Sequence, residues 1–192
     1  MEVKNKKIGF VLTGSFCTFK KTISIMKKLK KLEADIIPIM SYNSYLLDTK
    51  FGKAKDFIYE IEKICNKEII HTIQDAEPIG PKHLTDIILV APASGNTMSK
   101  LVGDIIDTPA LMAVKSHLRN NLPVVIAPST NNGLGAAAQN IGVLLNRKNY
   151  YFVPFRQDNP ITKPRSIVFD PEYIIKTLEY ALEGEQIQPI LL

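Results

Sequence analysis

The chain has 192 residues, a length that suits one α/β domain with a full hydrophobic core and is short for two domains. Hydrophobic residues make up 45% and charged residues 22%, which is ordinary for a globular protein. Lys and Arg outnumber Asp and Glu by 24 to 19, a net charge of +5. No aromatic-interleaved basic patch or nucleic-acid motif accompanies this charge, so we expect small anionic ligands and no nucleic acid.

Strand-like and helix-like segments alternate along the chain. The expected strands are residues 8–12, 36–40, 69–70, 87–90, 123–127 and 150–153. The expected helices are residues 15–33, 51–65, 98–106, 111–118, 133–145 and 172–183. Pro38 marks the second strand as an edge strand or weakens its pairing. The alternation predicts a three-layer α/β fold with a mostly parallel open sheet, of the flavodoxin or Rossmann type.

One turn of small and polar residues stands out. Residues 87–90 (IILV) form an aliphatic run typical of a strand buried on both faces. Residues 91–97 (APASGNT) follow, and a helical apolar pattern begins at Met98. A strand that enters a helix through such a turn directs free N–H groups and the positive end of the helix dipole at one spot. We expect this turn to bind a phosphate or a carboxylate.

Three other predicted strands end in similar turns. The four turns are residues 13–15 (TGS), 41–43 (SYN), 92–97 (PASGNT) and 128–133 (PSTNNG). Ligands of open parallel sheets bind at the carboxyl ends of the strands, so we expect the turns to form one shared site. Each turn taken alone is also explained by ordinary helix capping. The first turn lacks the GxGxxG spacing of a dinucleotide fingerprint.

The histidines and cysteines carry less information. His71, His83 and His117 are widely spaced, so no metal site is predicted. Cys17 follows the first polar turn and either lies near a ligand or fills the space between helix and sheet. With Cys65 as the other cysteine, there is no CxxC pair, and no signal peptide is recognisable. These features indicate a reducing cytoplasm, and the apolar runs are too short for a membrane span.

Residues 154–166 (PFRQDNPITKPRS) combine three prolines with three cationic side chains. The prolines favour an extended path, and Arg156, Lys163 and Arg165 suit a ligand with two carboxylates. A solvated loop or a contact with a partner subunit explains the composition equally well. Residues 185–192 are apolar for a terminus. We expect residues 1–192 to form a single domain whose last residues dock on a neighbouring surface.

Several of these stretches resemble the flavoprotein family of homo-oligomeric FMN-containing cysteine decarboxylases. The resemblance rests on residues 13–15, residues 92–101 (PASGNTMSKL) and Asp107. That family binds the FMN phosphate on turns after its first and fourth main strands. The resemblance therefore implies homo-oligomers and FMN as the cofactor, with these contacts: Thr13, Gly14, Ser15, Ser41, Ser94, Asn96 and Thr97.

Within the family, the chain is most similar to the B subunit of a two-subunit sporulation enzyme, over residues 76–82, 119–125, 129–132, 155–164 and 186–191. This resemblance implies an oxidoreductase subunit in the cytoplasm of the mother cell. With an A subunit that carries NADP, it would form pyridine-2,6-dicarboxylate from a dihydro- or hydroxytetrahydro-precursor. The candidate catalytic residues are Asn131 and Arg156. The residues expected to bind this small dicarboxylate are Asn131, Arg156, Lys163 and Arg165.

The chain also departs from the decarboxylases. Their catalytic His lines up near Pro78, and their PxMNxxM motif becomes residues 128–134, which keep Asn131 and lose both methionines. Two alternatives are therefore a stand-alone FMN-dependent decarboxylase or flavin prenyltransferase, which the missing His disfavours, and a non-catalytic scaffold subunit.

Overall fold

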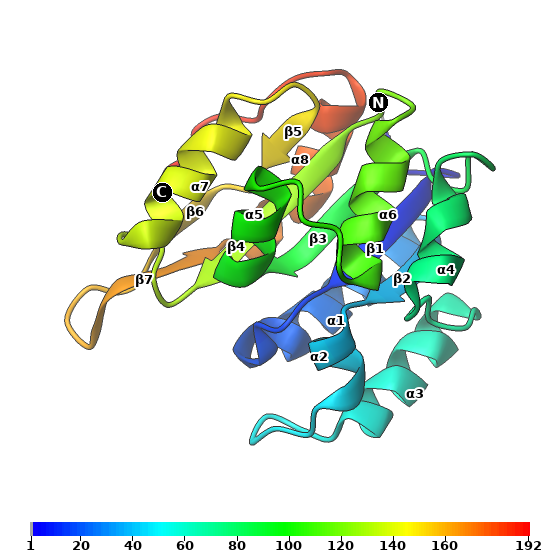
Figure 1. The fold of residues 1–192 in the computed structure, drawn as a ribbon, viewed down its shortest axis with the longest axis horizontal. Helices are drawn as coiled ribbons and strands as arrows, with labels where there is room; N and C mark the ends of the chain where they lie inside the picture. Colours follow the sequence, from blue (N-terminus) through cyan, green and yellow to red (C-terminus); the bar gives the residue numbers. More distant parts are fainter. Residues whose placement is uncertain (1) are drawn as a thin grey trace.

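The part of the chain that this computed structural model describes, residues 2–192, forms one seven-stranded sheet with helices on both faces (Figure 1). The strands are β1 (Lys7–Leu12), β2 (Asp35–Met40), β3 (Ile87–Ala93), β4 (Val124–Thr130), β5 (Tyr150–Phe152), β6 (Phe155–Asn159) and β7 (Lys163–Phe169). Their order is β2-β1-β3-β4-β7-β6, and β5 also pairs with β4. The five strands β1 to β5 run parallel to one another, whereas β7 is antiparallel to both β4 and β6.

Eight α-helices are formed within residues 2–192. They are α1 (Phe19–Lys31), α2 (Tyr42–Leu46), α3 (Ala54–Cys65), α4 (Ile73–Ala76), α5 (Gly95–Val102), α6 (Pro109–Leu118), α7 (Ala136–Leu145) and α8 (Ile174–Leu182). Three short 3-10 helices adjoin them. η1 (Phe16–Thr18) precedes α1, η2 (Glu77–Ile79) follows α4, and η3 (Pro171–Tyr173) precedes α8. Together with the sheet, these helices confirm the predicted three-layer, mostly parallel α/β fold.

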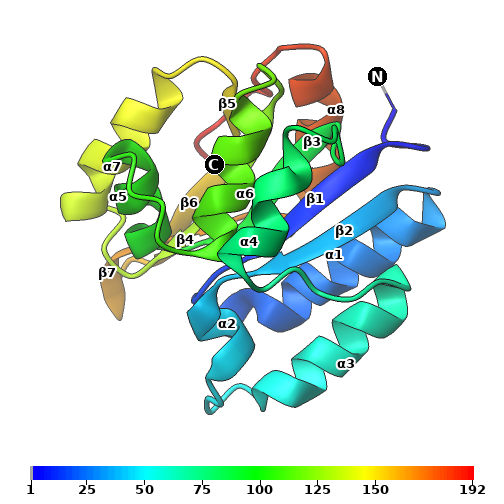
Figure 2. The same ribbon diagram turned by 45° about the vertical axis from the view of Figure 1, so that its right-hand side comes forward.

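The sheet separates two hydrophobic cores. In β1, Ile8, Phe10 and Leu12 pack with α1, α3 and α8, whereas Val11 packs on the other side with α5, α6 and α7. Figure 2 shows the sheet between α1 and α3 on one side and α4 and α6 on the other. All seven residues of β3 are buried, as expected for the central strand of a sheet covered on both faces.

Some predicted elements differ from the structure at their ends. The helix expected at 133–145 begins at Ala136, after a turn, and the helix expected at 172–183 begins at Ile174, after η3. The strand expected at 69–70 is only a single bridge between Ile39 and Ile70. The bridge is on the outer side of β2, which is the end strand of the sheet and pairs along its full length with β1. The prediction that Pro38 marks an edge strand is therefore confirmed.

The cationic segment at 154–166 forms a β-hairpin made by β6 and β7. The expectation of a loop at this place was therefore wrong. The tip of the hairpin is held by Asn159, whose side-chain oxygen accepts the N–H groups of Ile161 (3.0 Å) and Thr162 (2.8 Å). Gln157 donates its side-chain amide to the carbonyl of Pro164 at 2.8 Å. Because β7 pairs with the end of β4, the hairpin extends beyond the carboxyl edge of the parallel strands (Figure 1).

The C-terminal residues lie against β5 and β6 of the same chain. The Gln186 side chain exchanges two hydrogen bonds with the backbone of Phe152, at 2.7 and 2.8 Å. Phe155 donates its N–H to Ile190 and accepts from Leu192, at 3.0 and 3.1 Å. These contacts cover the edge of β6 and fix the tail beside the hairpin.

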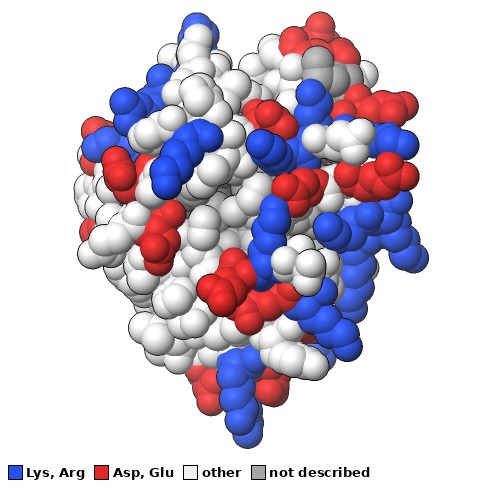
Figure 3. All heavy atoms as spheres, turned by 90° about the vertical axis from the view of Figure 1, so that its right-hand side faces the viewer, with Lys and Arg blue, Asp and Glu red and all other residues white. Residues whose placement is uncertain are grey.

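The basic side chains are mixed with acidic ones on the face drawn in Figure 3. Two of the α1 lysines are paired, Lys27 with Glu60 at 2.7 Å and Lys28 with Glu172 at 3.0 Å. The lysine-rich face of α1 is therefore solvated, and acidic residues of other elements pair with two of its lysines. No helix within residues 2–192 has the length and apolar character needed to cross a membrane.

Candidate functional site

The polar turns after β1, β3 and β4 meet at the carboxyl edge of the sheet and line one cavity of about 910 Å³. This volume lies in the range of roughly 300–1,000 Å³ that is usual for small-molecule sites. The hairpin β6–β7, the start of α7 and the segment before α3 complete its walls. The polar lining residues on these turns and the hairpin are Ser15, Ser94, Asn96, Ser99, Ser129, Thr130, Asn131, Asn132, Asp158, Lys163 and Ser166.

Thr13 holds the first two turns together. Its hydroxyl donates to the carbonyl of Pro92 at 2.7 Å and accepts from the N–H of Ser94 at 3.0 Å. Thr13 is only 1% exposed and does not line the cavity. This candidate cofactor contact therefore acts on the geometry of the site, because its hydroxyl is already committed within the chain.

Ser94 caps the N-terminus of α5. Two backbone donors of the first helical turn lie beside the cavity. The Ser94 hydroxyl accepts the N–H of Thr97 at 3.2 Å and lies 2.9 Å from the Thr97 hydroxyl. Gly95 and Asn96 follow Ser94, and their N–H groups belong to the first helical turn, which has no intrahelical acceptors. No side chain within residues 2–192 caps them. The turn thus offers two N–H groups at the positive end of a helix dipole.

The two glycines of these turns are there for different reasons. A Cβ at Gly95 would lie 2.7 Å from the Thr130 hydroxyl, so packing of α5 on the end of β4 requires glycine. A Cβ at Gly14 would meet nothing closer than 3.9 Å, and the φ of Gly14 is not in the left-handed region. Neither packing nor backbone conformation explains Gly14, which leaves open space at the cavity wall for a ligand to approach the backbone.

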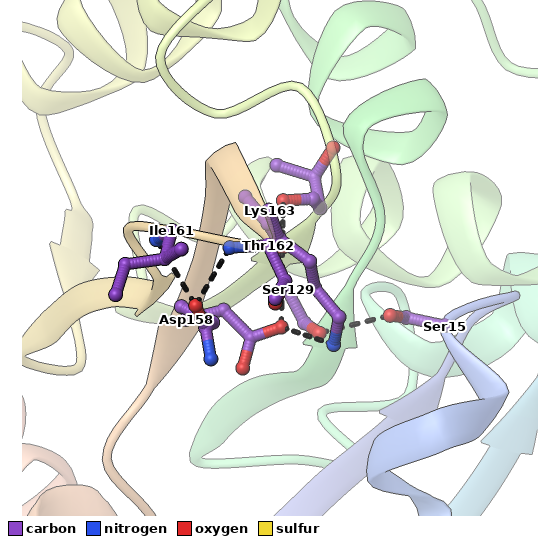
Figure 4. A network of polar contacts seen from close by, with 9 residues as sticks. Ser15, Ser129, Asp158, Ile161, Thr162 and Lys163 are labelled. Carbon is purple, nitrogen blue, oxygen red and sulfur yellow. Dashed lines mark hydrogen bonds and ion pairs between the residues drawn. The ribbon is translucent and has the colours of Figure 1, made fainter.

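Ser129 is a site residue that sequence reasoning did not single out. It is the last residue but one of β4, is 4% exposed, and its hydroxyl lies 2.9 Å from that of Ser15. Both serines line the cavity, and Figure 4 shows the contact that joins them. The polar turn at residues 128–133 was the signal for this position, but only the strand order shows that it faces Ser15 across β3.

Asn131 and its neighbours form the wall beside Ser129. Thr130, Asn131 and Asn132 all line the cavity, and the Thr130 hydroxyl accepts the N–H of Asn132 at 3.3 Å. The Asn131 side chain is exposed and has no hydrogen-bond partner within residues 2–192. Its amide is therefore free to donate to, or accept from, a ligand.

Lys163 and Asp158 face the cavity from the hairpin. Lys163 Nζ lies 2.7 Å from Asp158 Oδ2, and the hydrogen bond and charge of Asp158 raise the pKa of the lysine. The Ser166 hydroxyl also reaches Asp158 Oδ2, at 3.4 Å. Figure 4 shows this ion pair turned toward the two serines. The cationic end of Lys163 is thus present in the site together with a resident counter-ion.

Four other candidate residues do not line the cavity, and one of them is Thr97, which is buried in the first turn of α5. Arg156 Nη1 bonds to Asp170 Oδ2 at 2.7 Å. Arg165 is exposed on β7, where its carbonyl accepts the N–H of Leu134 at 3.0 Å. Ser41 is buried and caps α2, with its hydroxyl 2.9 Å from that of Ser44. The structure therefore brings together Gly14, Ser15, Ser94, Asn96, Asn131 and Lys163 at the cavity. The candidates outside its lining are Thr13, Ser41, Thr97, Arg156 and Arg165.

The cavity is electropositive and has aromatic walls. Its ionisable lysines and aspartate are Lys21, Lys50, Lys163 and Asp158, a formal net charge of +2. Phe16 and Phe51 line it as well, next to the exposed Cys17. This combination suits a ligand that carries a doubly charged anion and a flat aromatic group. No group of three His, Cys, Asp or Glu side chains suited to a metal occurs in the described part of the chain.

The family model named Flavoprotein matches residues 1–171, and the chain belongs to this family. Among curated proteins, it is 41% identical over 189 residues to the B subunit of dipicolinate synthase from Bacillus subtilis (strain 168), covering 98% of this chain and 94% of that protein. Membership of the family and similarity to this subunit, both expected from the resemblance of several stretches of the sequence, are confirmed.

Solved structures give the same result. The crystal structure of the dipicolinate synthase B subunit from Bacillus halodurans is 42% identical, has a TM-score of 0.91, and is covered over 98% of its length by 100% of this chain. The FMN-dependent cysteine decarboxylase SpaF shares the fold at 18% identity, with a TM-score of 0.72 over 94% of this chain and 97% of that one. The predicted flavodoxin-like architecture is thus confirmed.

Proposed function

We propose that this chain is the B subunit of a dipicolinate synthase and that it binds FMN in the cavity at the carboxyl edge of its sheet. Its near full-length similarity to the Bacillus subtilis B subunit supports the enzyme. FMN binding is supported by the open space at Gly14 and by the free N–H groups of Gly95 and Asn96.

The lining residues fit FMN. The phosphate would lie between Gly14, Ser15 and the first turn of α5, where backbone N–H groups and the helix dipole favour an anion. Ser94 and Thr97 would hold this turn in shape through their mutual hydrogen bonds. Phe16 and Phe51 provide aromatic surface for the ring system. Bound FMN would supply electron or hydride transfer.

Asn131 and Lys163 would hold the substrate, which we propose is a small dicarboxylate. The free amide of Asn131 would bind one carboxylate, and the ammonium of Lys163 would bind the other. We leave Arg156 and Arg165 out of direct contact in this proposal. Arg156 is bonded to Asp170, and neither arginine lines the cavity.

The rest of the proposal extends the family resemblance seen in the sequence. The product would be pyridine-2,6-dicarboxylate, made from a dihydro- or hydroxytetrahydro-precursor together with an A subunit that carries NADP. We also propose that the chain forms homo-oligomers. Its place of action would be the cytoplasm of the mother cell in a sporulating bacterium.

Reconstitution with the A subunit tests this proposal. The two subunits are co-expressed and dipicolinate formation is measured with and without added FMN, alongside the Asn131→Ala variant. We expect product only when both subunits are present, stimulation by FMN, and at least about a tenfold loss in the variant. Product formed by the A subunit alone would contradict the proposal. Full activity of the Asn131→Ala complex would instead favour a scaffold role.

A further inference from the structure

The cavity wall formed by the hairpin contains a counter-ion of its own. Lys163 Nζ lies 2.7 Å from Asp158 Oδ2, and both residues line the cavity. The other two lysines of the cavity, Lys21 and Lys50, have no carboxylate partner within residues 2–192. Asp158 is the one acidic group among the described lining residues.

Asp158 is held weakly. Its carboxylate is bonded to Lys163 and, at 3.4 Å, to the Ser166 hydroxyl, and no backbone N–H within the described chain donates to it. The neighbouring Asn159 is fixed by two backbone N–H groups. The side chains of Lys163 and Asp158 are 59% and 33% exposed, and ion pairs of such exposure are weak and exchangeable.

We propose that Asp158 occupies the place of a ligand carboxylate at Lys163 and competes with the dicarboxylate for it. Binding of the ligand would displace Asp158, and the return of Asp158 to Lys163 would favour release of the product. Asp158 is then a positioning residue that sets the affinity of the site through Lys163. This inference rests on the proposed dicarboxylate substrate.

Calorimetric titration of the full-length chain with pyridine-2,6-dicarboxylate tests the inference. Asp158→Asn keeps the size of the side chain and removes its charge, so we expect roughly fivefold tighter binding than in the wild type. Lys163→Met should weaken binding at least about tenfold. In the Lys163→Met background, the added Asp158→Asn change should have no further effect, because Asp158 acts through Lys163.

A matched control is Glu60→Gln, which removes the acid from the exposed pair with Lys27, also at 2.7 Å but away from the cavity. It should leave the affinity unchanged. Equal or weaker binding by Asp158→Asn would overturn the inference and leave the proposed function standing. Tightening that persists without Lys163 would also overturn it. Absence of binding to every variant would overturn both the inference and the proposed substrate.

Discussion

Ser15 and Ser129 are 114 residues apart in the chain, yet their hydroxyl oxygens lie 2.9 Å apart at the edge of the cavity. Ser15 follows β1, Ser129 lies near the carboxyl end of β4, and β3 separates these two strands in the sheet. The hydrogen bond therefore spans the central strand and fixes the relative position of two cavity walls.

We expect Ser129→Ala to lower the free energy of unfolding by about 1 kcal/mol, because the Ser15 hydroxyl loses its partner. Ser15→Ala should cost a similar amount. The double variant should cost less than the sum of the two, since both remove the same bond. Urea denaturation of the four proteins measures this coupling. Strictly additive losses would show that the bond contributes nothing.

Arg156 is predicted to support the hairpin and not the ligand. Arg156→Ala breaks the bond to Asp170, whose side chain also caps η3, so we expect a stability loss of up to about 1 kcal/mol. Affinity for FMN and for pyridine-2,6-dicarboxylate should stay within about twofold of the wild type. Calorimetry measures both. Loss of dicarboxylate binding with the fold intact would place Arg156 in the site, as its cationic segment suggested.

His117 makes the stability of the chain depend on pH. It is fully buried, and burial lowers its pKa from 6.5 to about 4. Its ring nitrogens bond to Thr85 and to the carbonyl of Pro123, at 2.8 and 3.0 Å. The unfolded chain binds a proton more readily than the folded chain, so stability falls as the pH drops from 6.5 toward 4.

Between pH 7.5 and pH 5, this histidine should remove about 2 kcal/mol from the free energy of unfolding. His117→Gln has no titrating ring and should lack this part of the loss, although it is less stable at neutral pH. Urea denaturation at the two pH values provides the comparison. Parallel losses in the wild type and the variant would show that His117 does not titrate as described.

The two cysteines should differ in reactivity. Cys17 is exposed and lines the cavity, whereas burial raises the pKa of the Cys65 thiol to about 12. We expect a thiol reagent at pH 8 to modify Cys17 in the folded protein and Cys65 only after unfolding. Saturating FMN should slow the reaction of Cys17. Equal rates for both thiols in the native protein would contradict the burial of Cys65.

The position of the site could be predicted from the sequence, because hydrophobic runs and polar turns alternate at the ends of β1, β3 and β4. The hairpin could not. Residues 155–159 (FRQDN) show no alternation of apolar and polar side chains, and prolines flank them, so a loop was the reasonable expectation. These residues form a strand because β6 pairs with β7, and β7 pairs with β4. The local sequence pattern does not contain this information.

The roles of individual residues were harder to predict than the site itself. Arg156 and Lys163 lie on the same hairpin and have the same charge, but Lys163 lines the cavity and Arg156 bonds to Asp170. That difference depends on the register of β6 against β7, which shifts near Asn159. Ser129 was missed for a related reason, since its partner Ser15 becomes a neighbour only through the strand order.

Fluorescence titration of the flavin tests whether the cavity binds FMN against Gly14. Gly14→Ala adds a methyl group that meets no atom of the chain within 3.9 Å, so the fold should be unaffected. The matched control is Gly142→Ala, on the exposed side of α7, where nothing lies within 4 Å.

We expect saturable FMN binding by the wild type and by Gly142→Ala, and at least about tenfold weaker binding by Gly14→Ala, with all three proteins equally folded. FMN affinity in Gly14→Ala equal to that of the wild type, or no binding by the wild type, would contradict FMN binding at Gly14.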